Sequence, residues 1–171
     1  MDARDAEFTA FVRARGAALA RTAWFLAGDP HLAEDLVQTA LAETYVRWPS
    51  VSDPEAYARR ALVSANAAWW RRRSAGEVPV RATPDAAGPD DTAAVAERVR
   101  VVAALRLLPA KQRAALVLRY YDDLSEADTA RAMGCSAGSV KRHVWRGLAR
   151  LRALLGEEQV AALRPEPGAS W

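Results

Sequence analysis

The spacing of apolar residues predicts three helices in the first half of the chain. From Phe8 to Leu26 they recur at intervals of three and four residues, and Gly28 follows them, as a helix-ending glycine does. Two Asp-Pro pairs, at 29–30 and 53–54, each provide an N-cap carboxylate followed by a proline suited to the first helical position. We therefore expect helices that end near 28, near Trp48 and near Arg73, joined by short connections as in an antiparallel bundle.

The second half has the same helical periodicity. Val95, Val99, Val102 and Leu105 predict one helix before Pro109, and residues 110–121 predict another. Ser125 and Asp128 form a capping box for a short helix over 126–133 that ends at Gly134. Ser136 is positioned to cap a longer helix, whose apolar residues are Val140, Val144, Leu148, Leu151 and Leu155. No segment alternates as a strand does, so the fold class is predicted to be all-α.

Residues 124–152 have the parts of a helix-turn-helix. A short helix with small residues at Ala127 and Ala130 is followed by a tight turn at Gly134 and then by the longer helix. At 100° per residue, the side opposite the apolar stripe carries Gly138, Arg142, Trp145, Arg146 and Ala149. Such a helix can lie in the major groove of DNA.

The amino-acid composition argues against several kinds of site and against membrane association. The chain has 171 residues, of which 51% are hydrophobic, with one cysteine and two histidines. A zinc cluster or an internal disulfide is therefore not expected, and neither is a cofactor. No apolar run is long enough to span a membrane, and the N-terminus lacks the apolar core of a secretory signal. We expect a cytoplasmic protein without a metal ion or membrane association.

Charge divides the chain into three parts. Residues 1–73 carry a net charge of +1, residues 74–97 of −4 and residues 98–171 of +6. The stretch 74–92 also has three prolines and no apolar periodicity, which predicts a flexible acidic linker between two small helical domains. Between Asp128 and Glu157 there are six basic residues and no acidic one. A basic module on an acidic tether is typical of a nucleic-acid-binding protein.

The longer helix supplies candidate DNA contacts. Its first turns should reach base edges and its later basic residues should meet phosphates. We expect base contacts from Ser139, Lys141 and Arg142, phosphate contacts from Arg146 and Arg150, and a position for Ser136 at the same DNA surface. The alternative is an arginine-rich face that is merely solvated. Trp145 could contact DNA or pack against another helix, and the sequence does not decide between them.

Longer sequence runs resemble a known family. The run RLLPAKQRAALVLRYYDDLSEADTARAMGCSAGSVKRHVWRGLARLR resembles domain four of the extracytoplasmic-function (ECF) sigma factors, in particular the actinobacterial SigE-type group. In the first half, TAWFLAGDPHLAEDLVQTALAETYVRW and DPEAYARRALVSANAAWWRRR resemble domain two. The resemblance implies domain two over 1–73, the linker over 74–92, domain four over 93–156 and a tail over 157–171.

The resemblance also implies partners and site residues. A sigma factor would bind bacterial core RNA polymerase and promoter DNA, and many relatives also bind an anti-sigma factor. Core-polymerase binding would fall on Glu34, Asp35, Leu36 and Gln38. Recognition and melting of the −10 element would fall on Arg59, Arg60, Asn66, Trp69, Trp70, Arg71, Arg72 and Arg73, residue types that hold unstacked bases and displaced strands. Which of the adjacent tryptophans meets DNA stays open.

Two other function classes have to be distinguished from a sigma factor. A stand-alone helix-turn-helix regulator would place a dimerisation surface or an effector pocket in residues 1–73. An enzyme with a small-molecule substrate would need a phosphate-binding glycine loop, a metal cluster or a nucleophile with a histidine partner, and the sequence has none of these patterns. The sequence therefore favours a sigma factor over a regulator, and predicts no enzyme activity.

Overall fold

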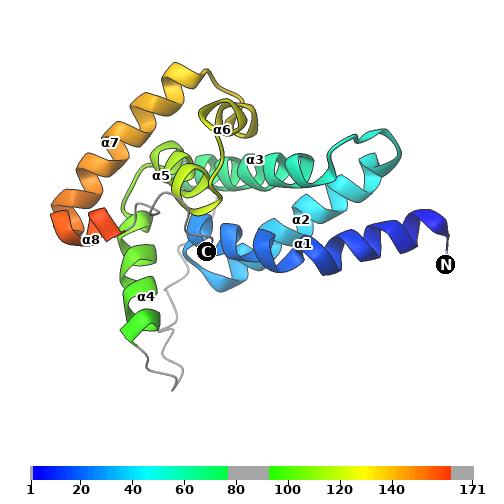
Figure 1. Cartoon of the computed structure of the whole chain (residues 1–171), viewed down its shortest axis with the longest axis horizontal. Coiled ribbons are helices and arrows are strands. Elements are labelled where there is room, and N and C mark those ends of the chain that lie inside the picture. Colours follow the sequence, from blue (N-terminus) through cyan, green and yellow to red (C-terminus); the bar gives the residue numbers. More distant parts are fainter. Residues whose placement is uncertain (1, 77–92, 163–171) are drawn as a thin grey trace.

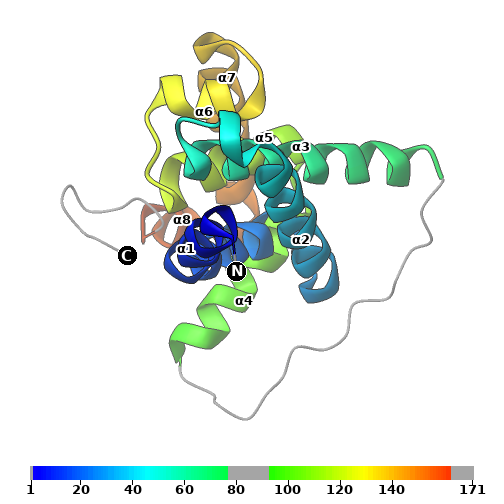
Figure 2. The ribbon, with the colours of Figure 1, turned by 90° about the vertical axis from the view of Figure 1, so that its right-hand side faces the viewer.

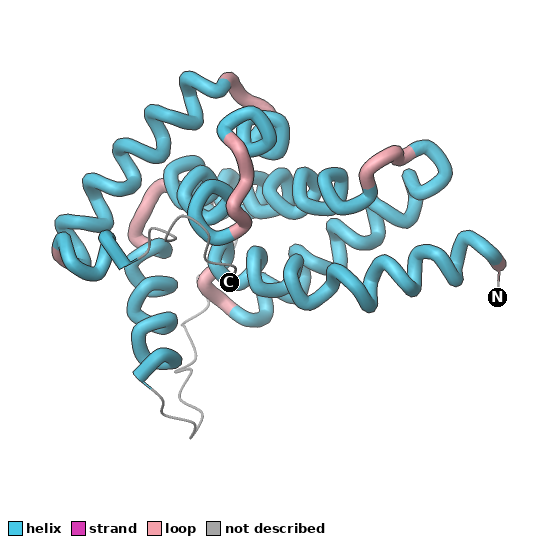
Figure 3. Tube along the Cα trace, viewed as in Figure 1, coloured by secondary structure: helices cyan, strands magenta, loops and turns pink. Residues whose placement is uncertain are grey.

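The computed structural model describes residues 2–76 and 93–162, and within these ranges every regular element is a helix (Figures 1 and 3). The α-helices are α1 (Ala3–Ala27), α2 (Pro30–Arg47), α3 (Pro54–Ser74), α4 (Ala93–Arg106), α5 (Ala110–Leu116), α6 (Glu126–Met133), α7 (Ala137–Leu155) and α8 (Glu157–Ala162). A 3₁₀ turn, η1 (Trp48–Ser50), follows α2, and a π-helical turn, η2 (Val117–Tyr121), follows α5. The predicted all-α class is confirmed.

The helix ends of the first half lie where the sequence predicts them. Gly28 adopts a left-handed φ of 66° and donates its N–H to the Trp24 carbonyl at 2.8 Å, which closes α1. Asp29 accepts a hydrogen bond from the Leu32 amide at 2.8 Å, and Asp53 accepts one from the Ala56 amide at 3.0 Å. Both Asp-Pro pairs therefore cap their helices as expected.

In the second half, α6 and α7 also begin at the predicted caps. Ser125 Oγ accepts from the Asp128 amide at 3.0 Å, and Ser136 Oγ accepts from the Ser139 amide at 3.2 Å. The prediction for residues 110–121 is only partly right, because α5 changes to the π-helical turn η2 at Val117. There the Asp122 amide donates to the Val117 carbonyl at 3.0 Å, five residues back, which widens the turn.

Helices α1, α2 and α3 form the expected bundle, and α6 and α7 lie together at one end of the molecule (Figures 1 and 2). The N-terminal part of α1 is fastened by an aromatic cluster of Phe8, Phe11, Tyr45 and Trp48. Phe8 stacks edge-on against Tyr45 and Trp48, with ring centroids 5.0 and 5.3 Å apart. This cluster fixes the turn that leads from α2 into α3.

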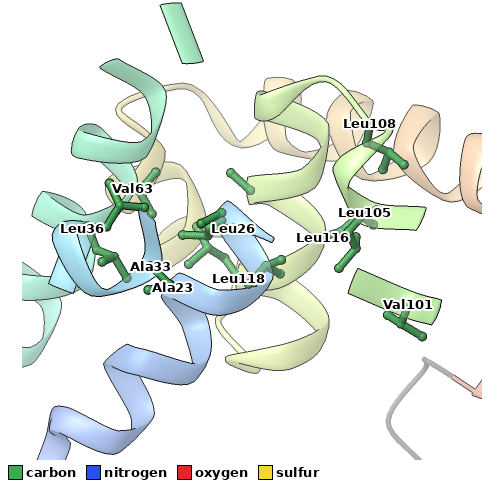
Figure 4. Packing of buried hydrophobic residues seen from close by; sticks show 14 of the residues in the cluster. Ala23, Leu26, Ala33, Leu36, Val63, Val101, Leu105, Leu108, Leu116 and Leu118 are labelled. Carbon is green, nitrogen blue, oxygen red and sulfur yellow. The ribbon is translucent and has the colours of Figure 1, made fainter. Parts of the chain in front are cut away.

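The two halves of the molecule pack against each other and share one apolar core. Ala23 and Leu26 of α1 lie in the same buried cluster as Leu105, Leu116 and Leu118 of the second half (Figure 4). The predicted linker lies almost entirely in 77–92, outside the described residues. The predicted tail includes a short helix, α8, whose Val160 is 2% exposed. The two halves are therefore connected by contacts between buried side chains as well as by the chain that joins them.

Two predicted packing positions are wrong. On α4, Val99 is 41% exposed, and its place in the core is taken by Val101, at 7%. On α6, Ala127 is exposed, and Thr129 is the buried residue beside Ala130. Each error is a shift of two positions around a short helix, where few residues define the apolar stripe.

Candidate nucleic-acid interface

The helix-turn-helix presents α7 with its basic side outward. Val140, Leu148 and Leu151 are buried, at 0, 8 and 2% exposure, as the apolar stripe predicts. Gly147 brings α7 close to α5, since a Cβ at this position would lie 2.8 Å from Leu116 Cδ1. The opposite side is exposed and carries Lys141, Arg142, Trp145, Arg146 and Arg150.

Local contacts order the start of this basic surface. Arg142 Nη2 donates to Ser139 Oγ at 3.2 Å, and Ser139 Oγ lies 3.0 Å from Ser136 Oγ. Lys141 pairs with Glu126 of α6 at 3.5 Å, with both side chains largely exposed. An exposed ion pair of this kind contributes little and can be exchanged for a phosphate. The predicted base-reading residues thus occupy the first two turns of α7.

The electrostatic character of α7 is uniformly positive. The helix has no acidic residue between Ala137 and Leu155. Partial burial lowers the pKa of His143, and the nearby charges of Lys111, Arg142 and Arg146 lower it further. Protonation of His143 is therefore disfavoured, and the basic surface is made by lysine and arginine. A polyanion is the natural complement of such a surface.

Helix α3 holds the second set of predicted DNA residues, which are far less exposed. Arg59 is 17% exposed at its side chain and pairs with Glu55 at 2.9 Å and with Asp122 at 3.3 Å. Asn66 is 1% exposed, and its Oδ1 has no hydrogen-bond partner in the described part of the chain. Within this set, the exposed side chains are Arg60, Arg71 and Arg72.

The adjacent tryptophans are both partly covered. Their rings meet edge to face, with centroids 4.9 Å apart, and Trp69 packs against the apolar core. The Trp70 ring lies under the guanidinium of Arg113, 4.4 Å from its centroid, and its Nε1 is buried without a partner among the described residues. Arg73 lies over both rings, at 5.2 and 5.4 Å. Each tryptophan ring is therefore already in contact with other side chains of the molecule, and both are half-buried.

Arg113 is a buried cation that the sequence does not single out. It is 0% exposed and hydrogen-bonds through Nη1 to the carbonyls of Leu105 and Arg106, at 3.4 and 3.3 Å. Burial lowers its pKa to about 10, and the charge of Arg106 contributes to the decrease. Nothing in the local pattern of α5 distinguishes this arginine from a surface residue, so only the folded structure reveals it.

Asp122 is the polar centre of the contact between the two halves. It accepts a hydrogen bond from Thr22 Oγ1 of α1 at 2.7 Å and pairs with Arg59 of α3. Burial raises its pKa, and the Thr22 hydrogen bond and the charge of Arg59 oppose that increase. A single carboxylate beyond η2 thus engages two helices of the first half.

A groove of about 1180 Å³ runs between the first half and α6. Its lining includes the connection from Ser50 to Asp53, Arg59 and Arg60 of α3, and Asp128 and Arg131 of α6. The Ser125 hydrogen bond lowers the pKa of Asp128, and Arg131 lowers it further. Both signs of charge line the groove, so it lacks the uniform charge of α7.

The residues predicted to bind a polymerase lie on the first turns of α2. Glu34, Asp35 and Gln38 are exposed side by side, whereas Leu36 is 4% exposed and belongs to the apolar core. In this arrangement Leu36 anchors the helix and cannot itself offer a surface to a partner. The three exposed residues form an acidic and polar patch that is separate from α7.

Two other features of the described residues bear on function. No described helix is both long and apolar enough to span a membrane. Within 2–76 and 93–162, no group of three His, Cys, Asp or Glu side chains is placed to hold a metal ion.

Sequence comparisons identify relatives that cover most of the chain. Residues 98–151 match the family described as sigma-70, region 4. This range includes most of α4, all of α5 and α6, and most of α7. The RNA polymerase sigma-E factor of Streptomyces coelicolor is 44% identical over 91% of this chain and 87% of its own length. That of Streptomyces avermitilis is 43% identical over 91% and 89%. The ECF RNA polymerase sigma factor SigL of Mycobacterium tuberculosis is 33% identical over 82% and 84%.

Solved structures agree with the sequence relatives. The sigma factor RpoE of Bartonella quintana, crystallised with the anti-sigma factor NepR, superposes with a TM-score of 0.71 at 25% identity, over 87% of this chain and 96% of that one. CnrH, solved with the cytosolic domain of CnrY, shares the fold with a TM-score of 0.63 at 24% identity, over 86% of each chain. Identity, coverage and fold together show that the chain belongs to the ECF family of RNA polymerase sigma factors.

Proposed function

We propose that this chain binds the core of a bacterial RNA polymerase and directs initiation at promoters with defined −10 and −35 elements. The observation that carries the proposal is the exposed face of α7, which offers five large side chains on an acid-free helix of a helix-turn-helix. Its membership in the ECF sigma family supports the same conclusion. The role is that of a specificity subunit, with no reaction catalysed by the chain itself, acting where the polymerase does, in the cytoplasm.

The −35 element is assigned to α7. Ser139, Lys141 and Arg142 occupy the first two turns, whose side chains lie nearest to base edges when a recognition helix enters the major groove. Arg146 and Arg150 follow on the exposed side and are suited to phosphates, which fix the register of the helix on DNA. Ser136 is assigned to the same surface because its hydroxyl orders Ser139.

The −10 element is assigned to α3. Some of the α3 residues must first lose their contacts with the second half of the molecule before they can bind DNA. Arg60, Arg71 and Arg72 are exposed and can meet the DNA backbone directly. Arg59 is held by Asp122, and Trp70 is covered by Arg113, so both must be released before they meet a melted strand. Asn66, Trp69 and Arg73 would take part after the same movement. We infer that domain four moves away from domain two when the promoter is opened.

The polymerase contact is assigned to Glu34, Asp35 and Gln38, with Leu36 holding α2 in place beneath them. Replacing Asp35 and Gln38 with alanine should reduce affinity for core polymerase, because both side chains are exposed acceptors and neither supports the fold. The measurement is a core-binding titration beside a thermal melt. Wild-type affinity with an unchanged melt would remove these residues from the contact.

An anti-sigma factor is a second candidate partner. The RpoE structure that this chain resembles is a complex with such a factor. The mixed charges of the groove between the two halves offer pairing sites of both signs to a protein segment.

The test of the proposed function is reconstitution. The purified full chain is mixed with bacterial core polymerase, captured by pull-down, and assayed for run-off transcription on a library of promoter fragments. Stable association and initiation from a selected set of promoters is the expected result. No association, together with sequence-specific duplex binding by the chain alone, would instead favour a stand-alone regulator.

A further inference from the structure

Trp145 is the largest exposed apolar side chain of the described residues, and the assigned −35 contacts do not use it. It is 71% exposed at the middle of α7, so it does not pack against another helix of this molecule. Val46, Leu107 and Leu154 are exposed apolar residues as well, and isolated cases of that kind are ordinary. Trp145 differs from them in its surroundings.

The surroundings of Trp145 are small and basic. Gly138, seven residues earlier, and Ala149, four residues later, lie on the same side of the helix and are exposed. Lys141 and Arg142, four and three residues earlier, flank the indole in the preceding turn. Small residues on both sides allow the helix backbone to approach a surface closely, and the indole then projects farthest toward it.

The charges on α7 indicate what kind of partner surface Trp145 would meet. Helix α7 carries five lysines and arginines and no acidic residue, and the five are Lys141, Arg142, Arg146, Arg150 and Arg152. An apolar protein groove would have to desolvate these cations, whereas duplex DNA pairs with them. The occupant that fits both the charge and the indole is the major groove of DNA.

The major groove offers one apolar group to such a side chain. The base edges present hydrogen-bond donors and acceptors there, together with the C5-methyl group of thymine. Indole presents a broad apolar face, and its only polar atom is a single N–H donor. Contact with a thymine methyl therefore buries apolar surface on both partners without leaving a base acceptor unpaired.

We propose that Trp145 contacts the C5-methyl group of a thymine in the −35 element and sets a preference for thymine at one position of that element. The inference rests on the proposed function, and it deepens that function by adding one specificity-determining residue to α7. Trp145 lies one turn after Arg142, so the thymine is next to the base pair that Arg142 reads.

The experiment removes the methyl group and nothing else. Holoenzyme made with the full chain binds a selected promoter in which each −35 thymine is replaced in turn by deoxyuridine. Wild-type protein should bind about four-fold more weakly at one position, the size expected for the loss of one buried methyl group. Trp145→Ala should bind the unmodified promoter more weakly and show no further decrease on the same replacement. Leu107→Ala, which removes another exposed apolar side chain, should behave as wild type.

Two results would overturn the proposal and leave the proposed function intact. A scan with no affected position in wild-type holoenzyme would show that the indole meets no methyl group, and sugar or phosphate contact would then account for any weakening by Trp145→Ala. An equal decrease at one position in wild type and in Trp145→Ala would assign the methyl contact to another residue. Failure of the wild-type holoenzyme to select any −35 element would reject the proposed function and this inference together, so the two failures are distinguishable.

Discussion

The two helices assigned to promoter DNA differ in how much of their DNA-binding side is open. On α7, Arg142, Arg146 and Arg150 are all exposed. On α3, Arg59 is 17% exposed and pairs with Asp122, and Trp70 lies under Arg113. Both partners of α3 come from the other half of the molecule. The DNA-binding side of the helix assigned to the −35 element is therefore open, and that of the helix assigned to the −10 element is largely covered.

The difference follows from position in the fold. Helix α7 lies at the edge of the molecule with one side on α5 and α6, so its other side stays free (Figure 1). Helix α3 lies between α1 and α2 on one side and α5 and α6 on another, so it is in contact on more than one side. Residue type thus indicates a candidate DNA contact, and packing decides whether that contact is available.

The largest expected effect comes from truncating the residue that covers α3. Arg113→Ala leaves a cavity in the shared core and should lower the free energy of unfolding by about 2–4 kcal/mol, by analogy with other large buried side chains. It should also uncover Trp70, which raises acrylamide quenching of tryptophan fluorescence. Chemical denaturation and quenching measure the two effects.

Two matched variants control that experiment. Arg113→Met keeps most of the volume and removes a buried charge, so it should cost about 1 kcal/mol or less. The increase in quenching should disappear when Arg113→Ala is combined with Trp70→Phe. Equal destabilisation by Ala and Met would mean that charge, rather than packing, makes Arg113 important.

The second-largest effect is expected for DNA binding by α7, whose basic side is exposed. Replacing Lys141 or Arg142 with alanine should weaken binding to the preferred −35 sequence by about 1–3 kcal/mol for each base-reading side chain removed, and should relax selectivity there. Arg146→Ala and Arg150→Ala should instead weaken all sequences similarly and reduce the salt dependence. Competition binding by the holoenzyme at two salt concentrations separates these patterns. Unchanged promoter choice in the first pair would remove Lys141 and Arg142 from base reading.

Sequence patterns predicted which side of α7 is exposed, but they did not predict the contacts that cover the candidate DNA-binding residues of α3. The caps at Ser136 and Asp53, the apolar stripe Val140–Leu148–Leu151 and the exposure of Arg142 all follow from local rules. The covering of Trp70 by Arg113 and the pairing of Arg59 with Asp122 depend on residues far apart in the chain. Such contacts leave no periodic signal, because either partner alone resembles a surface residue.

A smaller effect is expected at the helix caps, where the two helices should respond alike. Ser136→Ala and Asp53→Ala each remove a side-chain acceptor from one backbone amide and should each lower the free energy of unfolding by about 1 kcal/mol. Ser136→Ala should also reduce −35 binding, because Ser139 loses its hydroxyl partner. Chemical denaturation of both variants tests whether the two decreases in the free energy of unfolding are equal. A decrease for only one variant would show that tertiary contacts hold the start of the other helix.

The smallest expected effect is a dependence of domain contact on pH. Burial raises the pKa of Asp122 in the closed arrangement, whereas separation of the halves would return the carboxyl to water and to its ordinary pKa. Protonation therefore favours the closed arrangement. The closed arrangement should be strongest below the ordinary pKa of aspartate and weaken as pH rises through the raised value.

Small-angle scattering at several pH values measures this change in compactness. Thr22, Glu55 and Arg59 are the polar neighbours of Asp122 and stay constant in the control, Asp122→Asn, which should lose the dependence. The same dependence in Asp122→Asn would assign it to a different group.

The π-helical turn at Val117–Tyr121 makes the closed arrangement tolerant of one change in chain length. A π turn accommodates one residue more than an α-helical turn, and here it is directly followed by Asp122. Because a π turn with its extra residue and an α-helical turn without it rotate the chain by similar amounts, deleting one residue from this turn would leave Asp122 facing Thr22 and Arg59. Among relatives, a single-residue gap at this turn would therefore be compatible with the same closure, whereas a gap inside α5 would turn the carboxylate away by about 100°.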